Sequence, residues 1–424
     1  MVLIDSLVFS IYRFLALPMA LGILKFLSPF LSQKLQEMIT DRSAQNLQAL
    51  PARPIWIHAS SGEIEYAKSV IRALKEGFPQ IPVLVTYFSP SAKKLMQKFP
   101  GIDLAMPLPW DRPSDLEKFL NFYNPRTLLI ARTDVWPELA RIAKSRKIPS
   151  MLFAATFAAE SSRQGFLASS LTRMALNSLS GIFCVSDEDQ ENLRKLGVKA
   201  PLEVAGDTRF DQVLHRLKNP NPINNALKPA STDRIFICGS TWPEDEDILF
   251  DSFAAWISRG GRIVLAPHEV SPERLSHLEN QLQARQWTVT RYSKASKWES
   301  QILLVDQIGI LQELYSWGHL AFVGGSFKGK VHSVMEPLCL GIPVCVGPFH
   351  TNNREALQFQ FVQIQTGLYA VNVTQNANDL MQVMEKTWTL PKAQPAILQR
   401  VQRASGATEK LISWVENSLE VSEI

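Results

Sequence analysis

Short apolar runs alternate with amphipathic segments along most of this 424-residue chain, and this alternation restricts the fold more than any other feature. The runs are apolar on both faces, which is typical of strands in a parallel sheet covered by helices on each side. The segments between them repeat their apolar residues at helical spacing. We therefore predict an α/β protein, and its length favours two domains over one.

The first strand-and-helix series begins at residues 54–59 and closes at residues 202–204, and a second series starts at residues 235–238. Between them lies a stretch with three prolines, which is typical of a linker. Beyond residue 390 the pattern is helical. We therefore predict an apolar N-terminal segment at 1–31, a first domain at 32–217, a linker at 218–233, a second domain at 234–390 and a C-terminal helical segment at 391–424.

The N-terminal segment 2–31 is rich in Leu, Phe and Ile and carries three charged residues. A spanning helix needs about 20 apolar residues, whereas the charge-free run from Phe14 to Leu24 is shorter and contains Pro18. We expect a membrane-associated helix that lies in or dips into one leaflet. The alternative is an apolar helix packed on the first domain. No small-residue cleavage site indicates a removed signal peptide.

The net charge and the cysteine content limit which binding partners and which cellular compartment we expect. The formal net charge is +4, without the concentrated basic surface of a nucleic-acid binder, so we expect no nucleic-acid partner. The four cysteines stand in apolar contexts without C-x-x-C spacing. This pattern favours buried, reduced thiols over disulfides or a zinc site, and therefore a cytoplasmic setting.

Residues 55–75, IWIHASSGEIEYAKSVIRALK, show the chemistry of the first domain most clearly. An apolar strand is followed by a Ser-Ser-Gly turn and an amphipathic helix. Gly62 permits close approach of a backbone, and the first amides of a helix favour oxygen-rich groups. The turn presents Glu63, whose carboxylate serves either as a helix cap or as a general base. Thr133 and Asp134 follow another strand, so they should collect on the same rim of the sheet.

Residues 321–348 show the chemistry of the second domain most clearly. A strand ends in the glycine loop 324–326, and a helix predicted to begin near His332 would direct its amides at that loop. Glu336, one turn further on, suits the two hydroxyls of a ribose better than a phosphate. We predict a nucleotide site here. The alternative is a glycine turn kept for packing alone.

Nine segments in this order resemble the 3-deoxy-D-manno-octulosonic acid (Kdo) transferases of Gram-negative lipopolysaccharide synthesis. The resemblance implies a GT-B glycosyltransferase: two Rossmann-like domains facing a central cleft, with the acceptor side N-terminal and the donor side C-terminal. It also implies that the C-terminal helix packs back toward the N-terminal domain. The segments are IWIHASSGE, LPWDRP, ARTDVWP, VAGDTRFD, GSTWPEDED, APHEVSPER, VDQIGIL, FVGGSFKGKVHSVMEP and GPFHTNN.

The resemblance further implies transfer of Kdo from CMP-Kdo to a lipid A precursor, with inversion, without metal or cofactor, at the cytoplasmic face of the inner membrane. Glu63 matches the family's catalytic carboxylate, which would take the proton of the attacking hydroxyl. The resemblance makes no statement about the oligomeric state. We assign acceptor binding to Ser61, Gly62, Arg132 and Asp134, and donor binding to Ser240, Thr241, Pro267, His268, Ile308, Gly309, Ile310, Gly325, Ser326, His332, Ser333, Glu336 and Asn353.

Several motifs depart from the family pattern. The turn before Glu63 is one residue short, and residues 132–134 read Arg-Thr-Asp where relatives usually carry Glu-x-Glu. In the second domain, Pro267-His268 replaces Pro-Arg-His, residues 308–310 replace Met-Gly-Glu, and His332-Ser333 replaces His-Asn. A missing arginine removes a bidentate partner for phosphate or carboxylate. A glycosyltransferase with another donor or acceptor, and a non-catalytic relative that binds lipid or a partner, therefore remain as alternatives.

Overall fold

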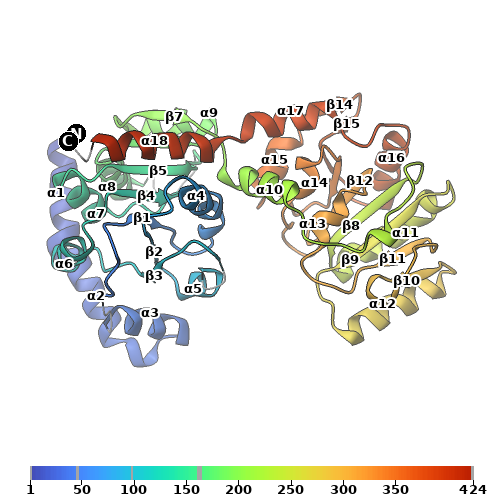
Figure 1. Ribbon diagram of the computed structural model, residues 1–424, viewed down its shortest axis with the longest axis horizontal. Coiled ribbons are helices and arrows are strands. Elements are labelled where there is room, and N and C mark those ends of the chain that lie inside the picture. The colour runs from blue at the N-terminus through green and yellow to red at the C-terminus, as the bar shows by residue number, and fades with distance from the viewer. Residues whose placement is uncertain (1, 44–46, 97–98, 160–164, 422–424) are drawn as a thin grey trace. The chain divides into compact units, whose positions relative to one another are not determined.

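The computed structural model describes residues 2–43, 47–96, 99–159 and 165–421. The chain forms two compact units (Figure 1). Unit 1 comprises residues 1–212 together with 404–424, and unit 2 comprises residues 213–403. Residues 213–217, which we predicted in the first domain, thus lie in the second unit.

Unit 1 is built on a seven-stranded sheet whose neighbouring strands all pair in parallel. The order of its strands is β3-β2-β1-β4-β5-β6-β7. The central strands are buried along their whole length, as their apolar sequences predict. The strands are β1 (Ile55–His58), β2 (Val83–Tyr87), β3 (Leu104–Pro107), β4 (Thr127–Ala131), β5 (Ser150–Ala155), β6 (Gly181–Cys184) and β7 (Leu202–Val204).

Helices cover both faces of this sheet because successive residues of each strand point to opposite sides. Ile55 and Ile57 of β1 pack in one core with α4 (Ile64–Gly77), α5 (Pro90–Met96) and α18 (Ala407–Val421). Trp56 packs in the other core. That core contains residues of α6 (Pro113–Tyr123), α7 (Pro137–Ser145), α8 (Phe166–Leu176) and α9 (Asp187–Leu196).

The N-terminal segment is one continuous helix, α1 (Val2–Ile11), a π-helical turn (Tyr12–Ala16) and α2 (Leu17–Phe26). The part from Ile4 to Phe26 has 23 residues and is long and apolar enough to cross a membrane. The charge-free run from Phe14 to Leu24 is one part of this longer helix, which Pro18 does not interrupt. Pro18 stands at the start of α2, just after the π-helical turn, where a missing amide is tolerated.

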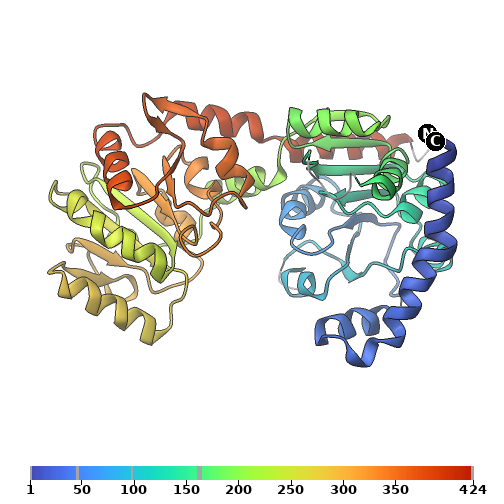
Figure 2. The same ribbon diagram turned by 180° about the vertical axis from the view of Figure 1, so that it is seen from behind.

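One side of this helix is tied to unit 1 by polar contacts. Asp5 pairs with Arg173 of α8, the Tyr12 hydroxyl donates to Asp111 Oδ2 over 2.8 Å, and Arg13 lies 3.7 Å from Glu138 of α7. Figure 2 shows α1 and α2 running along the side of the unit, with α3 (Gln33–Ser43) beyond their end. The outward side is an exposed apolar stripe at spacings of three or four residues: Ile4, Leu7, Ile11, Phe14, Leu15, Met19, Ile23 and Phe26.

Unit 2 repeats the architecture with a second seven-stranded sheet, in the order β10-β11-β9-β8-β12-β13-β16, whose neighbouring strands also pair in parallel. Its strands are β8 (Ile235–Thr241), β9 (Arg262–Pro267), β10 (Val289–Arg291), β11 (Ile302–Leu304), β12 (Leu320–Val323), β13 (Val344–Val346) and β16 (Val371–Val373). Its helices include α11 (Pro243–Ile257), α12 (Pro272–Ala284), α13 (Leu311–Tyr315), α14 (Met335–Cys339), α15 (Arg354–Phe359) and α16 (Ala377–Thr387). A hairpin, β14 (Gln363–Gln365) with β15 (Leu368–Tyr369), precedes β16.

Two helices lie where the chain passes between the units. The boundary at residues 212 and 213 falls within α10 (Thr208–Lys218), and the boundary at 403 and 404 falls at the end of α17 (Pro395–Ala404). The hydroxyl of Thr408 in α18 contacts the hydroxyl of Ser69 in α4 over 2.9 Å. The last helix is therefore part of the core of unit 1.

Each sheet reverses its strand order next to the first strand of the unit. In unit 1 the chain moves from β1 to β2 and β3 on one side and then from β4 to β7 on the other. In unit 2 the corresponding neighbours are β8 and β12. Ligands of such sheets bind beyond the carboxyl ends of the strands at these reversals. The loops after β1, β4, β8 and β12 are therefore the places to examine.

Asp111 provides a test of how α7 is held. The amides of Glu138 and Leu139, in the first turn of α7, have no intrahelical acceptor and donate to Asp111 over 2.9 and 2.8 Å. We expect Asp111→Ala to lower the free energy of unfolding by about 2 kcal/mol, since buried donors lose their acceptor. Urea denaturation measures the change. Glu117→Ala, an exposed position on α6, is the matched control, and an equal effect of both substitutions would contradict this account.

Candidate functional site

Glu63 stands at the turn between β1 and α4, and its carboxylate does not cap the helix. Glu63 is the residue before Ile64, but its side chain makes no cap hydrogen bond to α4. Oε2 instead accepts from the amide of Ser61 over 2.9 Å, and Oε1 lies 3.7 Å from Nη1 of Arg132. The side chain is 17% exposed, so a ligand on the rim can reach it.

Arg132 comes from the other side of the strand reversal, directly after β4. Its φ of 68° is left-handed, which costs a non-glycine residue about 1 kcal/mol or more. The guanidinium lies over the ring of Tyr66, 5.5 Å from its centroid, and that of Arg209 lies 4.3 Å from the same centroid. Two cations and two carboxylates therefore meet where β1 and β4 end, because Glu63 lies near Arg132 and Asp207 forms an ion pair with Arg209 over 2.7 Å.

The turn itself is open. A Cβ built at Gly62 would meet no atom within 4 Å, so packing within the described part of the chain does not require a glycine there. Ser61 contributes a hydroxyl 3.0 Å from that of Ser91, which in turn lies 2.9 Å from that of Ser89. These hydroxyl groups could form hydrogen bonds with a polyhydroxylated ligand.

His58, the last residue of β1, is fully buried beneath this rim. Its Nδ1 lies 3.0 Å from Thr86 Oγ1, and its Nε2 has no hydrogen-bond partner within the described part of the chain. Burial lowers the pKa of His58 to about 4, and the negative charge of Asp134 opposes this shift. The ring is therefore neutral at pH 7. It senses the charge of Asp134, one of the predicted acceptor residues.

In unit 2, the hydroxyl of Thr241 at the end of β8 is used within the protein. It donates to Glu246 Oε1 over 2.9 Å, and Glu246 also pairs with Arg274. The preceding residue, Ser240, is half-buried and has a left-handed φ of 55°. Of the two predicted donor-binding hydroxyls at the end of β8, only that of Ser240 forms no hydrogen bond within the described part of the chain.

The glycine loop after β12 is held by contacts within unit 2. The amide of Gly325 donates to Asp245 Oδ2 over 2.7 Å and that of Phe327 to Oδ1 over 3.0 Å. A Cβ at Gly324 would lie 2.2 Å from the carbonyl oxygen of Ser240, and Ser326 Oγ accepts from the amide of Gly347. These contacts are the ones that a packing turn requires. The following helix, α14, begins at Met335 and not near His332 as we predicted.

Three aromatic side chains form a stack beside this loop. The rings of Trp242 and His268 lie 4.5 Å apart, and those of His268 and His332 lie 4.6 Å apart with an interplanar angle of 13°. Trp242 Nε1 donates to His332 Nε2 over 3.1 Å, and the ammonium of Lys328 lies 3.4 Å from the centroid of the Trp242 ring. Burial lowers the pKa of His332, with smaller contributions from His268 and Lys330. His332 is therefore a neutral acceptor in this stack.

The remaining predicted donor residues lie around the same rim. Asn353 caps α15 and donates from Nδ2 to the carbonyl of His332 over 2.9 Å. Burial raises the pKa of Glu336, and a hydrogen bond from Ser333 opposes this shift. Pro267 ends β9, and Ile308, Gly309 and Ile310 precede α13, with Ile308 82% exposed.

Comparisons with known proteins agree with this geometry. Residues 32–212 match the family model described as 3-deoxy-D-manno-octulosonic-acid transferase (kdotransferase). The 3-deoxy-D-manno-octulosonic acid transferase of Haemophilus influenzae is 27% identical over 369 residues, 84% of each chain. That of Bordetella pertussis is 28% identical over 404 residues, 89% of this chain and 90% of the other. The chain is similar to the Kdo transferases.

A solved structure supports the fold of this Kdo transferase relative. The UDP-GlcNAc 2-epimerase of Neisseria meningitidis aligns with a TM-score of 0.56 at 13% identity and covers 85% of this chain and 98% of its own. At that identity the similarity concerns the fold alone. The predicted α/β fold of the GT-B type is confirmed.

The structure adds residues to which our reading of the Kdo transferase motifs gave no role. Arg132 joins Glu63 to the ring of Tyr66, and Arg209 lies over the same ring. His58 lies beneath this rim, and Trp242 stacks on His268. His58, Arg209 and Trp242 belong to the segments IWIHASSGE, VAGDTRFD and GSTWPEDED. Their presence in those segments was the sequence signal that could have identified them as site residues.

Stability at acid pH tests the state of His58. Its folded pKa of about 4 is below the unfolded value of about 6.5, so the unfolded chain binds more protons between these pH values. The contribution of the neutral His58 ring to the free energy of unfolding is therefore complete above pH 6.5. It is lost as the pH falls toward 4, and the loss amounts to about 3 kcal/mol. We expect His58→Gln to flatten the urea-measured stability over this range by that amount. His277→Gln, at an exposed position, should leave the slope unchanged, and an unchanged slope in His58→Gln would refute the buried neutral ring.

Proposed function

We propose that this protein transfers Kdo from CMP-Kdo to a hydroxyl of a lipid A precursor, with inversion at the anomeric carbon and without a metal ion or cofactor. The observation that carries the proposal is a carboxylate at the strand reversal of unit 1 that is not used as a helix cap. The curated relatives that match most of the chain carry the name of this transferase. The order of the motifs supports the same activity.

In the proposed mechanism, Glu63 is the general base. The Ser61 amide holds Oε2, so Oε1 is the oxygen that takes the proton of the acceptor hydroxyl. The hydroxyl oxygen attacks the anomeric carbon from the face opposite the nucleotide, and the bond from that carbon to the phosphate oxygen breaks. CMP leaves with the electron pair, and the configuration inverts. A base positioned in this way typically contributes about 10²- to 10⁴-fold to the rate.

The anionic groups of the two proposed substrates can be matched to the rims of the sheets in unit 1 and unit 2. The lipid A precursor is phosphorylated and the donor carries a phosphate and a carboxylate, and we propose that Arg132 and Arg209 attract such anions in unit 1. In unit 2 we assign the nucleotide to the rim formed by His268, Ser333 and Glu336. Glu336 would accept hydrogen bonds from the ribose hydroxyls. The stacked rings of His268 and His332 would offer a flat apolar surface to the base or sugar.

Replacement of Glu63 tests the proposal. We expect Glu63→Gln, which retains size but cannot accept the proton, to lower kcat for Kdo transfer at least about 100-fold with little change in KM. The assay follows CMP release from CMP-Kdo with a detergent-dispersed lipid A precursor. Glu65→Gln, two residues further on at a partly exposed surface position, is the matched control and should retain activity. Full activity of Glu63→Gln would refute the mechanism.

We propose that the protein acts at the cytoplasmic face of the inner membrane and that α1 and α2 lie in the membrane interface. Asp5, Tyr12 and Arg13 bind these helices to α7, α8 and Asp111 along one side. A helix held in this way cannot cross a bilayer without carrying polar parts of unit 1 into the hydrocarbon. The exposed apolar stripe on its other side is the surface that would enter the headgroup region.

The stripe makes a separate prediction. Phe14 and Phe26 are 72% and 80% exposed, so their replacement removes apolar surface without opening a core. We expect the double substitution Phe14→Gln and Phe26→Gln to move most of the protein from the membrane to the soluble fraction. The reason is that each buried aromatic side chain contributes about 2 kcal/mol to partitioning. Phe122→Gln, an exposed phenylalanine on α6, is the control, and a double variant that stays in the membrane fraction would contradict the interfacial placement.

A further inference from the structure

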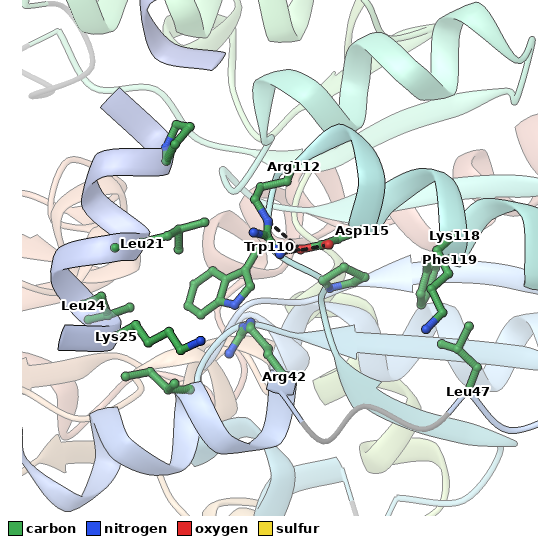
Figure 3. A pocket seen from close by; sticks show the side chains of 14 residues that line it. Leu21, Leu24, Lys25, Arg42, Leu47, Trp110, Arg112, Asp115, Lys118 and Phe119 are labelled. Atoms are coloured by element: carbon green, nitrogen blue, oxygen red, sulfur yellow. Dashed lines mark hydrogen bonds and ion pairs between the residues drawn. The ribbon is translucent and has the colours of Figure 1, made fainter. Parts of the chain in front are cut away.

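A cavity of about 500 Å³ lies between the N-terminal helix and the body of unit 1 (Figure 3). Its walls are α2, α3 and the segment that leads from β3 into α6. This volume is within the range of small-molecule sites, about 300 to 1,000 Å³. No part of the proposed transfer mechanism uses the residues that line it.

The polar wall of the cavity is cationic. Lys25 of α2 and Lys118 of α6 line it from two sides, and within the described part of the chain no carboxylate pairs with either lysine. Arg112 is paired with the only acidic lining residue, Asp115, over 2.7 Å. Figure 3 shows Lys25 directed from α2 into the space next to Trp110 and Arg42.

Arg42 adds a buried positive charge beneath this wall. Its guanidinium donates to the carbonyls of Met38, Leu108 and Phe88 and lies over the rings of Phe88 and Trp110. Burial lowers its pKa to about 10, so the group stays charged at pH 7. No carboxylate forms an ion pair with it among the described residues. The cavity therefore has an excess of positive charge that an anionic group would balance.

The apolar part of the lining comes from the same helix as Lys25, α2, which also carries the exposed apolar stripe. Leu21 and Leu24 point from α2 toward Trp110 in Figure 3. The same helix exposes Met19, Ile23 and Phe26 on its outer side. A molecule with an anionic head and hydrocarbon chains matches this combination, because its head would meet the lysines while its chains follow α2 into the bilayer.

The cavity is separate from the Glu63 rim. Phe119 and Leu47, which line it, pack with the core on the α6 and α7 face of the sheet. Glu63 precedes α4, whose residues form the core on the other face. None of the side chains that meet at Glu63, Arg132 and Tyr66 lines the cavity.

We propose that this cavity binds the headgroup phosphate of an anionic glycerophospholipid of the surrounding membrane, with Lys25 and Lys118 as its charged partners. The bound lipid fixes α2 against α3 and α6 and thereby sets how unit 1 lies on the bilayer. The proposal rests on the membrane association proposed above and not on the Kdo transfer reaction.

Calorimetric titration of the full chain with dihexanoyl-phosphatidylglycerol, a soluble anionic phospholipid, tests this site. We expect saturable binding of about one molecule per chain, and binding of dihexanoyl-phosphatidylcholine at least about tenfold weaker. Lys25→Gln and Lys118→Gln should each weaken binding of the anionic lipid about fivefold, since each lysine contributes about 1 kcal/mol. Lys34→Gln, an exposed lysine of α3 outside the cavity, should leave it unchanged.

Equal binding of the two lipids, or unchanged binding in both lysine variants, would overturn the proposal. Competition with the lipid A precursor would also overturn it, because the cavity would then be an acceptor site. A Kdo transfer assay on the same preparations keeps the two proposals apart. Lipid binding without transfer would refute only the transferase function, whereas transfer without lipid binding would refute only the lipid site.

Discussion

Parallel strand pairing is the constraint on which the rest of this structure depends. A parallel strand can follow another only through a crossover, so every strand of both sheets ends at the same edge as its neighbours. That geometry brings Glu63, which follows β1, to within 3.7 Å of Arg132, which follows β4, although 69 positions separate them in the chain (132 − 63). In unit 2 it brings Ser240 against Gly324 in the same way. The sheet topology therefore determines which residues come together at the candidate sites.

Within each unit, buried carboxylates hold the loops in place. Asp245 binds the amides of Trp242, Gly325 and Phe327 and so joins the start of α11 to the glycine loop. Burial raises the pKa of Asp245, and these three hydrogen bonds oppose the shift. Asp111 plays the corresponding part in unit 1, where it binds the first amides of α7 and the Tyr12 hydroxyl. The N-terminal helix is thus connected to the same framework as the strand edges.

The apolar strands could be predicted from the sequence, and most agree with the structure to within one or two residues, because continuous burial leaves an unambiguous pattern. Helices α3, α8, α9, α10, α15 and α16 and strand β16 were missed. The site residues could be named only through motifs. The left-handed backbone of Arg132, the stacked rings beside His332 and the engagement of the Gly325 amide depend on contacts between distant segments. Local sequence does not encode such contacts, and the roles assigned to these residues stay predictions.

Donor selectivity is the most direct test of the central claim, because Pro267-His268 and His332-Ser333 are motifs that depart from the pattern of the family that the chain resembles. The wild-type chain should be incubated with a detergent-dispersed lipid A precursor and, in parallel, with CMP-Kdo or a UDP-sugar or GDP-sugar. Mass spectrometry of the acceptor then reports any added sugar. The account predicts addition of Kdo from CMP-Kdo and no addition from the other donors. Addition from a UDP-sugar or GDP-sugar, or no addition from CMP-Kdo by a folded protein, would contradict it.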